Sequence, residues 1–192
     1  MGKQRKLNEE VISCIMISML DLLREKKFEK ISIIEIIEHA GVSRNSFYRN
    51  FKDKEDILVR YIESITQEFI KSAAILVFKV PWRKYIETIL NHMYENRDLV
   101  LILLKNNKIH LIRNIFDKAI YDRLAGIIDN HHIWFLSGGL FNLHQHWAEN
   151  GYKESSKDIA ETFDKIILGI RLHFGIDIKK RNPQQNNLLR VI

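Results

Sequence analysis

Cysteine and proline are scarce in this sequence. It contains one cysteine, Cys14, and two prolines among 192 residues. A single cysteine excludes an intramolecular disulfide and fits the reducing cytoplasm, and we expect Cys14 to be a small buried residue of the first helix. With only eight glycines as well, few positions force a helix to end. Together with 46% hydrophobic residues, these absences favour a helix-rich globular protein.

Long apolar runs are also missing. The longest, residues 73–78 and 99–104, have six residues each, whereas a spanning helix needs about 20. The basic residues near the N-terminus are followed by acidic ones and by no small-residue cleavage site, which argues against a secretory signal. The sequence therefore predicts a cytoplasmic protein without a membrane segment.

Signatures of catalysis and metal binding are lacking too. There is no glycine-rich phosphate loop, nucleophile elbow or arrangement of paired carboxylates. The closely spaced histidines, at 131–132 and at His144 and His146, lack the i, i+4 spacing that places two ligands on one helix face. We expect these histidines to lie at an interface or on the surface. The sequence thus predicts no enzyme activity, no metal site and no cofactor.

What the sequence does contain is helical periodicity. Apolar residues recur at three- and four-residue spacing, and no sustained alternation indicates a strand, so the predicted fold class is all-α. Asn8 is a plausible cap for the first helix. The expected helices cover about residues 8–26, 32–40, 44–50, 53 to the mid-70s, 82–95, 98–105, 108–129, 131–150 and 156–174.

Two short helices near the N-terminus are separated by a tight turn. Ser32 and Glu35 have the spacing of a capping box, and Gly41 can supply the positive φ of the turn. Ser43 is a cap for the next helix. This arrangement is a helix-turn-helix, whose second helix enters the major groove of DNA and presents its first residues to base edges.

The second helix of this motif has side chains suited to DNA. Phe47 and Phe51 are four residues apart and can anchor the helix to the core. Arginine and asparagine can pair with guanine and adenine, while hydroxyl and basic groups bind phosphate. Residues 41–54 hold four basic residues and one acidic residue. From the residues alone, a structural helical hairpin with solvated charges remains an alternative. The side chains left to point outward are Arg44, Asn45, Ser46, Tyr48 and Arg49, and Lys52 and Lys54 follow at the start of the next helix, where phosphate is favoured.

Residues 8–62 resemble the DNA-binding domain of the tetracycline-repressor (TetR) family. The resemblance rests on Ala40-Gly41-Val42-Ser43, on the run from Ser46 through Phe47-Tyr48-Arg49 to Phe51, and on Asp53-Lys54-Glu55. It implies that Arg44, Asn45 and Ser46 read bases and that Ser32, Tyr48 and Lys54 contact phosphates. Asn50 departs from the histidine common in the family, at a position that we expect to be peripheral.

The remainder resembles the family's regulatory half more loosely. The segment from Phe135 through Gly138-Gly139 to Trp147 and Gly151 is similar to the penultimate helix of such proteins. In the family the last two helices pair with their partners in a four-helix bundle. Two glycines inside a helix cost roughly 1 kcal/mol each, which close approach of a second helix would justify, although a kink or close packing within the monomer is the alternative. The expected dimer interface is Phe135, Gly138, Gly139, Phe141, Trp147, Ile166 and Ile170.

The resemblance implies a domain organisation and a mode of action. Residues 1–60 would bind DNA, residues 61–178 would bind a ligand and dimerise, and residues 179–192 would be a flexible basic tail. The expected partners are a palindromic operator, a second copy of the chain and an unidentified small-molecule effector that releases the repressor. Trp82, Tyr85, Phe116 and Trp134 are candidates for lining a cavity or for plain core. The alternatives are a helical interaction or scaffold protein and an activator regulated by a protein partner.

Overall fold

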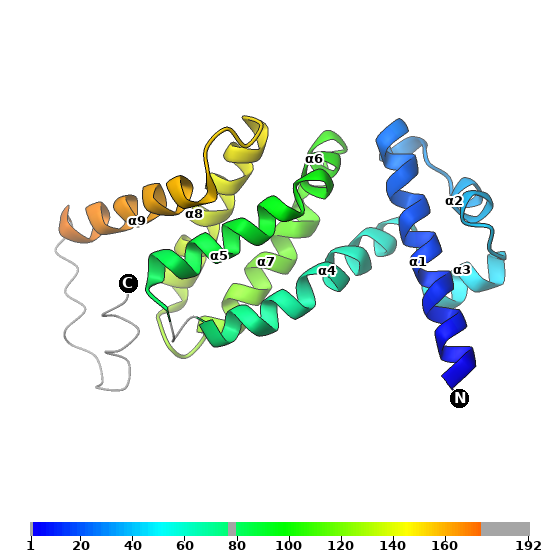
Figure 1. Ribbon diagram of the computed structural model, residues 1–192, viewed down its shortest axis with the longest axis horizontal. Helices are drawn as coiled ribbons and strands as arrows, with labels where there is room; N and C mark the ends of the chain where they lie inside the picture. Colours follow the sequence, from blue (N-terminus) through cyan, green and yellow to red (C-terminus); the bar gives the residue numbers. More distant parts are fainter. Residues whose placement is uncertain (1, 77–79, 174–192) are drawn as a thin grey trace. The chain divides into compact units, whose positions relative to one another are not determined.

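The computed structural model describes residues 2–76 and 80–173. Every regular element in these ranges is helical, which confirms the expected all-α fold (Figure 1). The chain forms two compact units, the first from Met1–Thr66 with Ile102–Ile112 and the second from Gln67–Leu101 with Arg113–Ile192. The elements are α1 (Gly2–Glu25), the 3-10 helix η1 (Phe28–Lys30), α2 (Ile33–Ala40), α3 (Arg44–Asn50), α4 (Lys54–Leu76), α5 (Trp82–Glu95), α6 (Arg97–Lys105), α7 (Ile109–Leu124), α8 (Asn130–Glu149) and α9 (Ser156–His173).

Helix α1 begins at Gly2, six residues before the expected start. The preceding segment contains glutamine, arginine, lysine and leucine, all good helix formers, and Arg5 forms an ion pair of 3.0 Å with Glu9 one turn later. Asn8 is therefore inside the helix, and the prediction that it caps α1 is wrong. Its side chain is free to bond elsewhere in the first unit.

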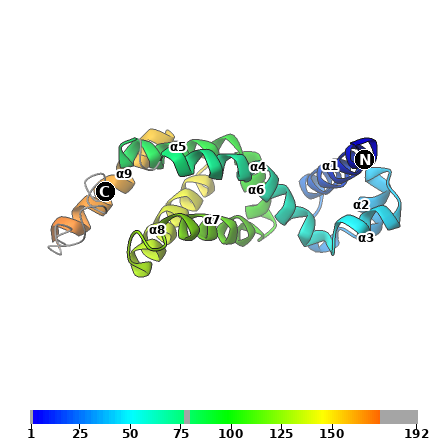
Figure 2. The ribbon, with the colours of Figure 1, turned by 90° about the horizontal axis from the view of Figure 1, so that it is seen from below.

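The core of the first unit lies where α2 and α3 pack against α1 (Figure 2). Ile15, Met19 and Leu23 are spaced by four residues and are fully buried, as the periodicity predicts. Phe47 of α3 and Ile57 of α4 complete this core. Cys14 is exposed rather than buried, because the buried stripe of α1 passes beside it.

The first unit also includes the corner between α6 and α7. The backbone N–H of Phe28 donates to Oδ1 of Asn106 over 2.9 Å, and the Asn106 side chain is buried, with 1% exposed. Lys108 forms an ion pair of 2.6 Å with Glu55 at the start of α4. No periodicity in the sequence indicates this return of the chain, since it depends on hydrogen bonds between residues far apart in sequence.

In the second unit α5 and α8 both pack against α9. Helix α7 ends at Leu124, five residues earlier than expected. Gly126, with φ of 77°, takes a left-handed conformation that an α-helix cannot continue through. Asp129 then caps α8 by accepting a hydrogen bond from the N–H of His131. The inward face of α5 comprises Trp82, Tyr85, Ile86, Ile89, Leu90 and Met93.

Helix α8 corrects three expectations. Phe141 is fully buried and Trp147 is 2% exposed. Trp147 stacks on Tyr94, with 5.6 Å between ring centroids, and donates its indole N–H to the carbonyl of Glu154. Both aromatic residues therefore belong to the core of one chain, not to a dimer interface. His144 is also fully buried, not at a surface.

Candidate DNA-binding site

The capping box at the start of α2 is present as predicted. The N–H of Glu35 donates to Oγ of Ser32, and the N–H of Ser32 donates to a carboxylate oxygen of Glu35. Glu35 also forms an ion pair with Lys26, which directly follows the last residue of α1. The hydrogen bond from Lys26, followed by that from the Ser32 N–H, lowers the pKa of Glu35 to about 2. The Ser32 hydroxyl donates to Glu35 as well, so both donors expected to meet phosphate are engaged within the chain.

The turn between α2 and α3 has the geometry that the motif requires. Gly41 adopts a φ of 64°, and its N–H returns to the last turn of α2. The Ser43 side chain accepts a hydrogen bond from the N–H of Ser46 over 3.1 Å, and its hydroxyl donates to the Ser46 hydroxyl over 3.0 Å. These bonds fix the start of α3, the end of the helix that meets base edges in this motif.

Helix α3 has two chemically distinct faces. Phe47 and Phe51 are buried, and their ring centroids lie 5.9 Å apart. On the other face Arg44, Asn45 and Arg49 are exposed, and Tyr48 is 60% exposed. Ser46 is half-buried beside its cap. Within the described ranges, Arg44 and Arg49 form no ion pair with an acidic side chain. The outward face of α3 therefore offers the donors that the sequence predicts for DNA.

Lys54 lies differently from expectation. Its ammonium group donates to the carbonyl oxygens of Phe28 over 2.6 Å and Ile31 over 2.9 Å, and it sits 4.4 Å from the centroid of the Phe28 ring. The lysine thus ties the start of α4 to η1 instead of extending toward solvent. Lys52, by contrast, is exposed. Asp53 caps the start of α4, because its Oδ1 accepts from the N–H groups of Glu55 and Asp56.

Asn50 is not peripheral, contrary to the expectation from sequence. Its side chain is 8% exposed and forms hydrogen bonds with Asn8 of α1. Its partner Asn8 is 42 residues away in sequence, so no local pattern indicates which residue it contacts. An asparagine next to the buried Phe51, at the end of an amphipathic helix, is a signal for such a contact, since buried amides need partners.

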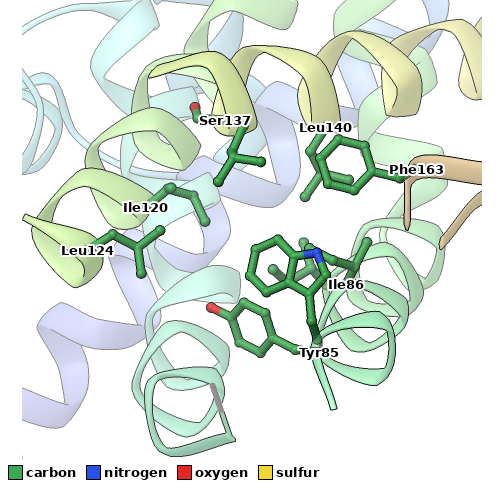
Figure 3. Close-up of a pocket in the computed structure, with 10 residues that line it drawn as sticks. Tyr85, Ile86, Ile120, Leu124, Ser137, Leu140 and Phe163 are labelled. Carbon is green, nitrogen blue, oxygen red and sulfur yellow. The ribbon is translucent and has the colours of Figure 1, made fainter. Parts of the chain in front are cut away.

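The second unit contains a small apolar cavity (Figure 3). Its interior volume of about 10 Å³ is close to the space that one water molecule requires. Of the four aromatic residues that the sequence offers as candidates for a cavity or for plain core, Trp82 and Tyr85 line the cavity. Phe116 packs against the ring of Phe141, and Trp134 is exposed. Figure 3 shows side chains of α5, α7, α8 and α9 around this space, among them Tyr85, Ile86, Ile120, Leu124, Leu140 and Phe163.

The second unit also has exposed apolar side chains on its last two helices. Trp134 and Phe135 of α8 and Ile166 and Leu168 of α9 are each about half exposed. A Cβ atom at Gly138 or Gly139 would lie 3.5 Å from its nearest neighbour within the chain, an ordinary contact. Packing within one chain therefore leaves room for alanine at both positions. The side chain of Ile170 lies outside the described residues, as does the tail 179–192.

No group of three or more histidine, cysteine or acidic side chains in the described ranges is arranged to hold a metal ion. None of the helices in them combines the length and apolar character that crossing a membrane requires.

Two family profiles match this chain, one near its N-terminus and one over its C-terminal half. The profile of "Bacterial regulatory proteins, tetR family" matches residues 20–61, and that of "Transcriptional regulator C-terminal region", also a TetR profile, matches residues 81–169. Together these regions make up more than half of the chain. No curated protein matches the sequence.

Solved structures share the fold at low sequence identity. A putative TetR-family transcriptional regulator from Syntrophomonas wolfei str. Goettingen has a TM-score of 0.61 and 20% identity, over 90% of this chain and all of the other. FadR from Bacillus subtilis, solved in complex with stearoyl-CoA, has a TM-score of 0.53 and 16% identity, covering 79% and 94%. The dihydroxyacetone kinase operon activator DhaS has a TM-score of 0.55 and 15% identity, covering 83% and 94%.

The family profiles and the helix-turn-helix point to the same class of protein. Proteins of this family are transcription factors, not enzymes. The chain belongs to the TetR family of DNA-binding transcriptional regulators.

Proposed function

We propose that this regulator is a cytoplasmic homodimeric repressor that binds a palindromic operator and is released by a small-molecule effector. The observation that carries the proposal is the exposed polar face of α3, with Arg44, Asn45 and Tyr48 outward and Phe47 buried beneath. Two such helices related by a two-fold axis would read two half-sites about 34 Å apart, or a multiple of that distance.

The proposed contacts divide into base reading and phosphate binding. Arg44 and Asn45 have the planar donor and acceptor groups that pair with guanine and adenine, and Ser46 lies beside them in the first turn of α3. Tyr48, Arg49 and Lys52 are exposed and would bind phosphates. Ser32 and Lys54 are left out of this set, because their donor groups are engaged within the chain.

Dimerisation is proposed to cover the apolar surface of α8 and α9. Phe135 is 56% exposed and Ile166 is 48% exposed, and large exposed apolar side chains on adjacent helices are typical of an interface. Gly138 and Gly139 support this assignment, since packing within the chain does not require glycine at either position. Close approach of a partner helix would explain why the helix-propensity cost of both glycines is tolerated.

The effector is proposed to enter the second unit at the cavity lined by Trp82, Tyr85 and Phe163. Because the walls are apolar apart from a few polar groups, the ligand would be largely apolar. FadR, which shares the fold, was solved with the acyl compound stearoyl-CoA. The space in this chain is too small for such a molecule, so binding would select a state with displaced walls and could thereby change the spacing of the two recognition helices.

The second candidate function is an activator regulated by a protein partner. Two observations favour it. The cavity has room for about one water molecule, and DhaS, which shares the fold, is an operon activator. Reporter transcription with and without the regulator gene distinguishes the two candidates, since loss of a repressor raises expression from its operator and loss of an activator lowers it.

The experiment that tests the proposal is selection of binding sites from a duplex DNA library with a randomised centre. The native chain should enrich a palindrome, and Tyr48→Ala should fail to do so at the same protein concentration. Arg44→Ala should weaken binding of the selected site by about 1–3 kcal/mol and relax preference at one base pair per half-site. If a folded dimer enriches no sequence, the operator-binding proposal is rejected.

Sedimentation of the free protein tests the dimer separately. Phe135→Glu should shift a dimer toward monomer, because it would bury a charge in an apolar interface. Trp134→Ala, on the same helix, introduces no charge and should weaken the dimer less. A native protein that sediments as a monomer at all accessible concentrations would contradict the homodimer.

A further inference from the structure

We infer that Asn8 and Asn50 form an amide pair that positions Arg49 and thereby sets the DNA preference of α3 without touching DNA. The inference rests on the DNA-contacting role proposed for Arg49. It assigns a function to α1, which packs on the recognition helix and has no contact of its own in the proposed set.

The pair is reciprocal. Nδ2 of Asn8 donates to Oδ1 of Asn50 over 3.1 Å, and Nδ2 of Asn50 donates back to Oδ1 of Asn8 over 3.2 Å. Nδ2 of Asn50 also donates to the carbonyl of Ser46 over 2.8 Å. Two opposed hydrogen bonds between planar amides fix both the distance between α1 and the end of α3 and their relative rotation. An apolar contact would allow the two helices to slide past each other. A buried asparagine pair is used in the same way to fix helix register.

Arg49 joins this pair from the exposed side. Its guanidinium donates to Oδ1 of Asn8 over 3.1 Å. Oδ1 of Asn8 therefore accepts from both Asn50 and Arg49. Within the described ranges Arg49 has no acidic partner, so the neutral amide orients the guanidinium and leaves its positive charge available to a phosphate.

The consequence for binding follows from the entropy of the side chain. An arginine that is mobile on the surface loses rotamer freedom when it binds DNA, and this loss costs binding free energy. If the arginine is already ordered before binding, that cost is smaller. Losing this ordering should weaken binding of the selected duplex roughly 3- to 10-fold. Since the amide pair also holds the end of α3, base preference should broaden as well.

Asn8→Ala is the primary variant. Alanine favours helix more than asparagine does inside α1, so folding is not at risk from helix propensity. The expected result is a roughly 3- to 10-fold weaker affinity for the site selected by the native chain, together with a broadened selected motif. Asn50→Ala should give a similar loss, and the double variant should lose little more than either single one, because both remove the same pair.

Two further variants separate positioning from general destabilisation. Asn106→Ala removes a buried amide elsewhere in the first unit and should lower stability without changing the selected motif. In an Arg49→Ala background, Asn8→Ala should have less effect on affinity than in the native chain. A general loss of stability would instead persist undiminished in that background.

The outcomes distinguish this inference from the proposed function. If the native chain selects no sequence, operator binding and the inference both fall. If the native chain selects a palindrome but Asn8→Ala leaves affinity and motif unchanged, only the inference is overturned. The inference is also overturned if Asn8→Ala weakens the affinity for DNA equally in the native chain and in the Arg49→Ala background.

Discussion

The two units differ in what they leave exposed. On α3 of the first unit, Phe47 is buried, and side chains with polar groups are outward, among them Arg44 and Tyr48. On α8 and α9 of the second unit, large apolar side chains such as Phe135 and Ile166 are outward. Within the described ranges, both surfaces are left exposed. A polar, cationic surface fits the phosphates and base edges of DNA, whereas an apolar surface fits another protein surface.

The two units also differ in how completely their buried polar groups are hydrogen-bonded. In the first unit, the buried Asn50 is paired with the half-buried Asn8, and the buried Asn106 accepts a hydrogen bond from the backbone of Phe28. In the second unit, Nδ1 of the buried His144 has no hydrogen-bond partner among the residues that the structure describes. The first unit therefore uses buried polar groups to fix geometry, and the second tolerates an imperfectly satisfied one. The expected effects of the following changes test this contrast, from the largest to the smallest.

The largest effect is expected from Trp147→Ala. The side chain is almost fully buried and contacts Tyr94 and Tyr152. Its removal should lower the free energy of unfolding by about 3–5 kcal/mol, measured by urea denaturation. Trp134→Ala, at an exposed position of the same helix, should cost the single chain far less. If the Trp147→Ala loss depended on protein concentration like a dimer dissociation, its place in the core would be wrong.

Mild acid should destabilise the second unit before the first. Burial lowers the pKa of His144 to about 4, below its unfolded value of about 6.5. Because the unfolded state binds the proton more readily, stability is complete above pH 6.5 and declines as the pH falls toward 4, by on the order of 3 kcal/mol. Glu35 of the first unit, with a pKa of about 2, loses its contribution only as the pH falls from about 4.5 toward 2.

Urea unfolding at about pH 7.5 and about pH 4.5 measures this difference. His144→Gln, which keeps a polar group near Tyr152 but cannot titrate, should reduce the pH dependence. An equal pH dependence in the native protein and the variant would show that His144 is not its source.

Lys54→Met should act on stability rather than on DNA. It removes the hydrogen bonds to the carbonyls of Phe28 and Ile31, which should cost about 1–3 kcal/mol. The salt dependence of DNA binding should be unchanged. Lys52→Ala should show the reverse, a slope shallower by about one phosphate contact at unchanged stability. If Lys54→Met instead made the salt dependence of DNA binding shallower, Lys54 would contact a phosphate, as the sequence predicts.

The smallest effect is expected at the glycines, where the two units should respond with opposite sign. Gly41→Ala forces alanine into a φ of 64° and should cost about 1 kcal/mol, and Gly41→Asn should cost less. Gly139→Ala should raise the stability of the single chain by up to about 1 kcal/mol, because it has room. Thermal unfolding and sedimentation together would show whether Gly139→Ala weakens a dimer instead.

Local signals predicted most of the first unit. The capping box at Ser32, the turn at Gly41 and the cap at Ser43 depend on residues within four positions of one another, and all three are present as expected. The burial of Phe47 and Phe51 followed from helical periodicity. The contacts of Lys54 and Asn50 within the chain were not predicted, because their partners Phe28 and Asn8 are at least 26 residues away in sequence.

Aromatic residues of α8 show the same limit in the second unit. Phe135 and Trp147 were both predicted at the interface, and only Phe135 is exposed. Periodicity cannot distinguish a residue buried within one chain from one buried between chains, since both are apolar. The packing of Tyr94 and Tyr152 around Trp147 decided between these alternatives.

The amino-acid sequence by itself determined the helical class, the helix-turn-helix and the chemistry of the face that α3 presents, because caps, turns and periodicity are short-range properties. Only the tertiary structure decided which polar groups remain available for a ligand. Asn8, Asn50 and Lys54 look like surface residues in the sequence, yet each is engaged by a partner distant along the chain. Such pairings form because a buried amide or ammonium group must replace its lost water with other hydrogen bonds.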